Sequence, residues 1–182
     1  MKEEILNIIV DWWAKKIINT KHDNGAYDFT NFMANKLADM GVEQLATEQI
    51  EGFKRDLKEE IIKMYEEFPN SNLYLGCDYS PCLELRNAGE KNNIPELNFP
   101  FKVSMWFSNN HVNVRGGYGA KTETIYATEE YYLDRIKSTE ESIKKYENKY
   151  YAWCTDEENL EAIIALKEDV ENYKKAIVKL NN

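Results

Sequence analysis

KVSMWFSNNHVNVRGGY, residues 102–118, is the stretch of this sequence that decides the fold. Apolar and polar side chains alternate along much of it, and a period of two residues is typical of β-strands. Asn109-Asn110 divides the stretch, and asparagine accepts the backbone angles of a tight turn. The pattern predicts a hairpin of two antiparallel strands, Lys102–Phe107 and Val112–Tyr118.

The segments around this hairpin complete an α+β fold. Two more strands are predicted, Leu73–Cys77 before the hairpin and Thr122–Tyr126 after it. Apolar residues at helical spacing, with capping residues beside them, predict helices on both sides of this region. The predicted helices span residues 2–19, Asn31–Met40, about Glu48–Phe68 with Thr47 as N-cap, Ser80-Pro81 to about Lys91, Glu129 to about Tyr151 with Thr128 as N-cap, and a final helix opened by a Thr155–Glu158 capping box. We expect a small, largely antiparallel sheet flanked by the N-terminal helices.

The two C-terminal helices carry heptad seams. Apolar residues recur in both at alternating intervals of three and four, and helices pack along such seams. The short connection between them predicts an antiparallel helical hairpin. We therefore divide the chain into an α+β core, residues 1–127, and a helical hairpin packed on it, residues 128–182. The seams can join the two helices of one chain or two chains in a homodimer, and both alternatives stay open.

Composition predicts an acidic protein of the cytoplasm. Its 23 basic and 32 acidic residues give a net charge of -9, which repels phosphate backbones, so we expect no direct specific nucleic-acid binding. The start MKEEILNIIVDWW lacks the features of a signal peptide, and no apolar run is long enough to cross a bilayer, so no membrane partner is expected. The three cysteines, Cys77, Cys82 and Cys154, are expected as reduced thiols.

The sequence contains no complete metal, cofactor or catalytic motif. Cys77 and Cys82 lack the second ligand pair of a structural zinc site, since His22 and His111 form no closely spaced pair. The glycine-rich stretch after His111 is no phosphate loop, because Ala120 replaces the required glycine and a strand follows instead of a helix. We therefore predict no metal, no cofactor and no catalytic residue.

The enzymatic alternative is an inconspicuous site in the α+β core. Two converging carboxylates suffice for acid–base chemistry or for magnesium binding. A cysteine nucleophile with a histidine base is a second arrangement that the residues allow. The candidate residues for such a site are Cys77, Asp78, His111, Arg115 and Glu123.

Four segments of the chain resemble a known group of proteins. They are Ile9–Ala14, His22–Gly25, Leu75–Cys82 and the stretch from Phe99-Pro100-Phe101-Lys102 to Met105-Trp106. Together they are similar to the type II-A anti-CRISPR proteins of mobile elements in low-GC Gram-positive bacteria, which inhibit an RNA-guided effector nuclease. The resemblance runs from the first helix to about residue 120 and does not include the C-terminal hairpin.

The resemblance implies a non-enzymatic protein of the bacterial host cytoplasm. Such a protein binds the CRISPR effector nuclease with its guide RNA and obstructs target-DNA engagement or cleavage. The effector's channels are basic, so carboxylates on acidic helices can lie where phosphates would, while aromatic residues anchor the complex. The partner-binding residues we expect are Trp13, Asp23, Asp78, Trp106, Arg115, Tyr118 and Glu123. The alternatives are a small cytosolic α+β enzyme and an oligomeric scaffold protein.

Overall fold

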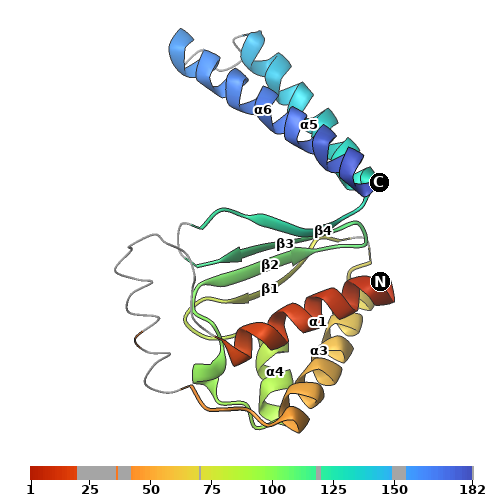
Figure 1. The fold of residues 1–182 in the computed structure, drawn as a ribbon, viewed down its shortest axis with the longest axis vertical. Helices are drawn as coiled ribbons and strands as arrows, with labels where there is room; N and C mark the ends of the chain where they lie inside the picture. Colours follow the sequence, from red (N-terminus) through yellow and green to blue (C-terminus); the bar gives the residue numbers. More distant parts are fainter. Residues whose placement is uncertain (20–35, 37–41, 70, 118–119, 149–154, 182) are drawn as a thin grey trace. The chain divides into compact units, whose positions relative to one another are not determined.

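The computed structural model of this chain describes residues 1–19, 36, 42–69, 71–117, 120–148 and 155–181 (Figure 1). These residues form two compact units, Met1–Tyr126 and Ala127–Asn182. The predicted fold class, α+β, is confirmed. The described residues contain five α-helices and a four-stranded antiparallel sheet.

The sheet is a meander whose strands lie in chain order. Its strands are β1 (Leu73–Cys77), β2 (Val103–Phe107), β3 (His111–Gly116) and β4 (Glu123–Ala127). All four predicted strands are confirmed: β1 has the predicted bounds, and the ends of the other three differ from the predicted ones by no more than two residues. The predicted turn is confirmed as well, because the Ser108 amide donates a hydrogen bond of 3.0 Å to the His111 carbonyl across the two asparagines.

Three helices lie together on one side of this sheet (Figure 1). They are α1 (Glu3–Ile18), α3 (Thr47–Glu67) and α4 (Leu83–Lys91). Successive side chains of a strand point to opposite faces, so every second strand residue faces these helices. The fully buried side chains of the resulting core include Ile5, Ile9, Trp13 and Ile17 of α1, Phe53, Leu57 and Ile61 of α3, Leu85 of α4, and Leu75, Val103, Met105 and Phe107 of the sheet.

The start of α3 differs from the predicted one. Thr47 is its first helical residue and not its N-cap, and Ala46 occupies the cap position. Alanine has no side-chain acceptor, so the helix start relies on Gln49, whose side-chain oxygen accepts a hydrogen bond of 3.0 Å from the Ala46 amide. The Gln49 side chain also donates to the carbonyls of Asn92 and Asn93, which ties this helix start to the end of α4.

The start of α4 also differs, because Ser80-Pro81 does not open the helix. Pro81 forms an isolated antiparallel bridge with Cys77. The Cys82 amide donates a hydrogen bond of 2.8 Å to the Gly76 carbonyl. These backbone contacts continue the edge of β1, so the helix begins only at Leu83, with Cys82 as its N-cap.

A buried asparagine joins the end of α1 to the chain that enters α3. Asn98 closes a short 3-10 helix, Glu96–Asn98, and is completely buried. Its side-chain amide donates to the carbonyls of Ile17 at 3.2 Å and Glu43 at 2.9 Å, and its oxygen accepts from the Glu43 amide at 3.2 Å. The predicted helix Asn31–Met40 lies, but for one residue, outside the described part of the chain.

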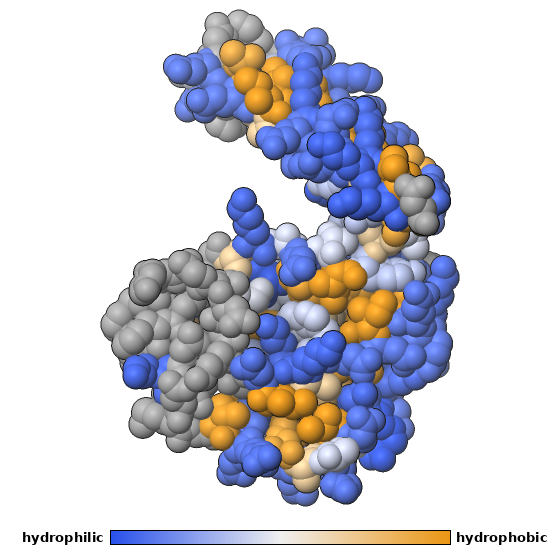
Figure 2. Space-filling view, in the orientation of Figure 1, coloured by the Kyte–Doolittle hydropathy of each residue, from blue (hydrophilic) through white to orange (hydrophobic). Residues whose placement is uncertain are grey.

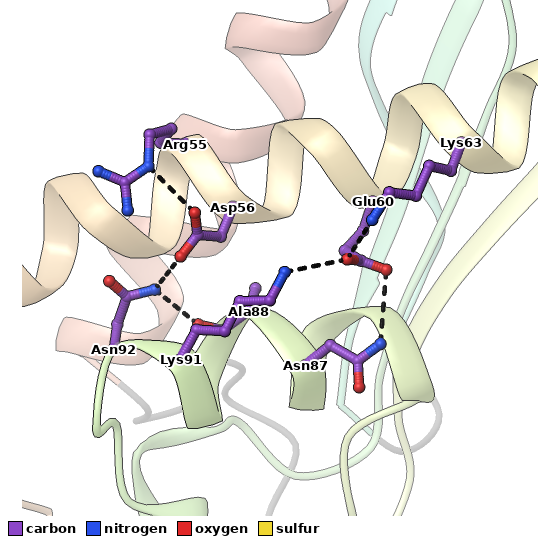
Figure 3. Close-up of polar contacts among 8 residues, drawn as sticks. All are labelled: Arg55, Asp56, Glu60, Lys63, Asn87, Ala88, Lys91 and Asn92. Carbon is purple, nitrogen blue, oxygen red and sulfur yellow. Dashed lines mark hydrogen bonds and ion pairs between the residues drawn. The ribbon is translucent and has the colours of Figure 1, made fainter.

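A polar network fastens α4 to α3 (Figure 3). Asp56 of α3 is buried, and its carboxylate accepts hydrogen bonds from Arg55 at 3.0 Å and Asn92 at 2.7 Å. Burial by itself raises the pKa of Asp56, but the hydrogen bonds from Arg55 and Asn92 outweigh it and leave the pKa below its ordinary value. Glycine at position 52 leaves room for the Asn92 side chain, because a Cβ atom at position 52 would lie 1.9 Å from the Asn92 amide oxygen.

Glu60 forms the second half of this network (Figure 3). Its carboxylate accepts a hydrogen bond from Lys63 at 2.9 Å on its own helix, and from Asn87 at 3.4 Å and Lys91 at 3.3 Å on α4. The hydrogen bond from Lys63, with those from Asn87 and Lys91, lowers the pKa of Glu60. The charged form of Glu60 therefore helps to hold the two helices together.

The second unit is an antiparallel hairpin of α5 (Glu129–Glu147) and α6 (Asp156–Leu180). Both predicted N-terminal caps are confirmed, since Thr128 accepts a hydrogen bond from α5 and Thr155 forms a capping box with Glu158. α5 ends four residues before the predicted position, and residues 149–154 lie outside the described part.

The heptad seams of α5 and α6 pack against each other within one chain. Ile143 and Val170 are the most deeply buried apolar residues of the seam, at 8% and 6% exposure. Lys167 and Glu147 form an exposed ion pair of 3.4 Å between the helices. The seam is therefore an intramolecular contact. Whether a second chain also uses the hairpin stays a prediction.

Replacing Asn98 with alanine should destabilise the first unit by about 2–4 kcal/mol, because three hydrogen bonds are lost and buried backbone groups lose their partner. Urea unfolding followed by circular dichroism measures the change in the free energy of unfolding. The matched control is Asn72→Ala, at an exposed asparagine, which should change it by less than about 0.5 kcal/mol. Equal effects of the two substitutions would contradict the role of Asn98.

Glu60→Gln should reduce the loss of stability in acid. The pKa of Glu60 is lowered by folding, so its contribution is present above the ordinary glutamate value and is lost as the pH falls through the lowered folded value. Between about pH 7 and pH 3, the variant should therefore lose less stability than the parent protein in urea unfolding. Glu59→Gln, at an exposed neighbour, is the control. If both variants keep the parent's profile, Glu60 does not hold the helices through its charge.

Candidate functional site

The side of the sheet turned away from α1, α3 and α4 carries the strand residues that alternate with the core. We call this surface the outer face. Its residues on β1, β2 and β3 are Tyr74, Gly76, Ser104, Trp106, Asn113 and Arg115. Tyr74 is 44% exposed, Trp106 is half-buried and Arg115 is exposed, whereas Met105 between Ser104 and Trp106 is completely buried. The outer face therefore offers an aromatic and cationic surface to solvent.

Strand register brings three of these side chains into contact. Tyr74 lies opposite Trp106, and their rings are 5.9 Å apart at an angle of 51°. Ser104 lies opposite Arg115, two residue pairs further along the strands and so on the same face. The Arg115 guanidinium reaches back over Trp106 and stands 5.4 Å from the centre of the indole, the geometry of a cation–π contact. Tyr74, Trp106 and Arg115 therefore form one stacked cluster.

Gly76 makes room for this cluster. A Cβ atom at Gly76 would lie 2.0 Å from the Tyr74 hydroxyl oxygen, so a larger residue would push the tyrosine away. With glycine there, the Tyr74 ring extends along its strand and its hydroxyl lies 3.4 Å from the Ser104 hydroxyl. The Tyr74 hydroxyl therefore occupies the space that a side chain at position 76 would fill.

Lys102, which directly precedes β2, forms a rim beside this cluster. Its backbone has a φ of 57°, its amide donates to the Asp78 carbonyl at 3.1 Å, and its carbonyl accepts from the Gly117 amide at 3.0 Å. The ammonium group forms an ion pair with the Asp78 carboxylate and lies 4.0 Å from the centre of the Tyr79 ring. The hydrogen bond to Asp78 raises the pKa of Lys102, so this cation stays charged at neutral pH.

Tyr74 and Arg115 of the stacked cluster, together with Lys102 of the rim, line a hollow of about 450 Å³. Its lining residues are Tyr74, Cys77, Asp78, Lys102, Ser104, Arg115 and Gly117. The functional groups around it are mostly hydrogen-bond donors: a guanidinium, an ammonium and two hydroxyls. The carboxylate in the lining, Asp78, already contacts Lys102. Such a hollow is suited to receive an acceptor group.

Large apolar side chains reach the surface in separate patches among hydrophilic residues (Figure 2). On the first unit, Tyr79 is 77% exposed and packs edge-to-face on Phe101 at 5.2 Å, next to the Lys102 rim. Leu83, at the start of α4, is 63% exposed. Small patches of apolar residues among polar groups are typical of interfaces between separately folded proteins.

Three of the expected partner-binding residues come together at the outer face. Asp78 and Arg115 line the hollow, and Trp106 stacks under Arg115. Trp13 does not belong with them: it is fully buried in α1 and is a core residue. Adjacent helical residues point in different directions, and it is Trp12 that reaches the surface in part.

The other expected residues lie elsewhere or are not described. Glu123 is exposed at the start of β4, but the next residue, Thr124, donates a hydrogen bond of 2.8 Å to Asn113 of the outer face. Strand alternation therefore turns Glu123 to the opposite side. Asp23 and Tyr118 fall outside the described residues.

Three of the five candidate catalytic residues, Cys77, Asp78 and Arg115, line the hollow, whereas His111 and Glu123 are not among its described lining residues. Cys77 pairs through β2 with Gly116, whereas His111 stands at the other end of β3, roughly 16 Å away along the strand. Burial raises the pKa of the Cys77 thiol to about 12, so it stays protonated at neutral pH. His111 contacts Ser108 at 3.0 Å within the turn. A cysteine–histidine pair is therefore not formed by these two residues.

Sequence reasoning missed two lining residues that matter. Tyr74 alternates with buried Leu73 and Leu75, so the period of β1 could have placed it on the same face as Trp106. Lys102 could not have been found in this way, because its position depends on a positive φ and on loop contacts with Asp78.

Within the described residues, no three His, Cys, Asp or Glu side chains gather as a metal site would require. None of the described helices combines the length and the apolar character needed to cross a membrane. No protein-family model and no curated protein matches the sequence. The interpretation of the outer face therefore rests on its own geometry.

Cys77 should resist alkylation in the folded protein. With a pKa of about 12, only on the order of 1 in 10,000 of its thiols is a thiolate at pH 8. Iodoacetamide treatment followed by peptide mapping should leave Cys77 unlabelled in buffer and label it fully in urea, where burial is lost. Rapid labelling of Cys77 in the folded protein would contradict this prediction and make Cys77 a candidate nucleophile again.

Proposed function

We propose that this protein acts by binding another macromolecule through the outer face of its sheet. The observation that carries the proposal is the stacked cluster of Tyr74, Trp106 and Arg115. Tyrosine, tryptophan and arginine are the residues most enriched at the energetic centres of protein interfaces. Helices support the sheet from behind, so the cluster is held in place before a partner arrives, which reduces the entropy lost on binding.

The partner we propose is the guide-loaded effector nuclease of a type II CRISPR system, in the cytoplasm of the bacterial host. The resemblance of the segments in the first unit to type II-A anti-CRISPR proteins supports this choice. The charge distribution is compatible with it: residues 71–127 carry five basic and five acidic side chains, so the net charge of -9 comes from residues 1–70 and 128–182. Acidic helices would steer the protein towards a basic nucleoprotein, and the outer face would anchor it. The bound protein would obstruct target-DNA engagement or cleavage.

Trp106→Ala should weaken binding to the guide-loaded effector by about 30-fold, or about 2 kcal/mol, because it removes the centre of the stacked cluster. Affinity is measured by biolayer interferometry with immobilised effector, and inhibition by a DNA-cleavage assay. Both readouts should weaken together.

Phe68→Ala is the matched control, since Phe68 is an aromatic residue with 52% exposure at the end of α3, away from the outer face. It should leave affinity and inhibition unchanged. Circular dichroism and thermal unfolding of both variants show whether Trp106→Ala keeps its fold. The absence of any complex between the parent protein and the effector would refute the choice of partner, and equal weakening by both substitutions would refute the choice of surface.

A further inference from the structure

We infer that the hollow of the outer face receives a carboxylate side chain, Asp or Glu, of the protein partner, with Arg115 as the group that binds it. The inference rests on the proposed binding function and names the chemistry that the outer face recognises. It concerns one contact at the centre of the surface.

Arg115 is the uncompensated charge of the hollow. Its exposed guanidinium stacks on Trp106, and no acidic side chain in the described part of the chain lies within ion-pair distance of it. Lys102, the other cation of the lining, forms an ion pair with Asp78. A cation–π contact engages the charge of the guanidinium but none of its N–H groups as a donor to an oxygen, so these donors can still bind an acceptor.

The other lining groups also suit an oxygen acceptor. The hydroxyls of Tyr74 and Ser104 lie 3.4 Å apart and both line the hollow. A carboxylate accepts two parallel hydrogen bonds from a guanidinium and has lone pairs left for hydroxyl donors. The hollow, at about 450 Å³, also has room for the aliphatic part of a Glu side chain beside Tyr74.

Charge favours a single carboxylate over a phosphate chain. A nucleic-acid strand presents a row of charges, which the net charge of -9 repels. A lone carboxylate on a protein partner meets mainly the field of Arg115 at contact distance, because salt screens exposed charges beyond about 8 Å at physiological ionic strength.

The first test uses arginine side-chain NMR of the full-length ¹⁵N-labelled protein. Its four arginines, Arg55, Arg86, Arg115 and Arg135, give separate Nε–Hε signals that single Arg→Lys substitutions assign. The probes are the blocked peptides Gly-Glu-Gly and Gly-Gln-Gly and inorganic phosphate. We expect the Glu peptide to shift the Arg115 signal in a saturable way, the Gln peptide to leave it unchanged, and phosphate to bind more weakly than the Glu peptide.

Two results of this titration would overturn the inference. Equal shifts of all four arginine signals would mean unspecific charge attraction. Phosphate binding at Arg115 as tightly as the Glu peptide, or more tightly, would mean a site for phosphate and so point to nucleic acid. Because the peptides replace the partner, this titration gives an answer even if the effector nuclease does not bind.

The second test compares Arg115→Gln with Arg135→Gln in binding to the guide-loaded effector. Arg135 is the matched control, because it also stacks on an aromatic ring, that of Tyr173 at 5.6 Å, but lies on the hairpin. We expect about a tenfold loss of affinity for Arg115→Gln and none for Arg135→Gln. An unchanged affinity of Arg115→Gln, in a complex that Trp106→Ala does weaken, would leave the proposed function standing and refute the role of the hollow.

Discussion

The structure of the first unit depends on one asymmetry: helices pack on a single face of its four-stranded sheet. Met105 and Phe107 are completely buried beneath α1 and α3, while the residues between and before them, Trp106 and Ser104, point the other way. A strand cannot turn one of these sets inward without turning the other outward. The core therefore fixes which side chains form the outer face, and any change that shifts the register of β2 would bury the site.

Polar contacts at the back of the sheet keep this asymmetric packing in one arrangement. Apolar contacts alone leave the relative sliding of helices loosely specified, whereas buried polar groups demand particular partners. Asn98 supplies such contacts through its hydrogen bonds to the end of α1 and to the chain that enters α3. Asp56 of α3 supplies another through its hydrogen bond with Asn92 at the end of α4. The rigidity of the outer face is thus supported by residues on the far side of the core, which are not part of the outer face.

Sequence patterns predicted the fold more completely than they predicted the candidate site. Strand alternation and the Asn109-Asn110 turn gave the correct sheet, because they reflect local backbone geometry and burial. Helix starts were less predictable: the first hydrogen bonds of α4 compete with a bridge between Cys77 and Pro81 that joins residues through space. The hollow depends on such non-local facts throughout, from the positive φ of Lys102 to the clearance that Gly76 gives Tyr74.

The acidic residues of the helical regions and Arg115 of the outer face act on a partner over different distances. The acidic residues lie mainly on helical regions and act together over a distance of about one Debye length, which affects the rate of encounter more than the choice of contact. Arg115 acts at hydrogen-bond distance, where direction matters, and its contact with Trp106 holds the guanidinium over the indole ring. The acidic residues can thus steer the protein towards a basic partner. Arg115, in the cluster with Tyr74 and Trp106, still requires a carboxylate at one defined point of that partner.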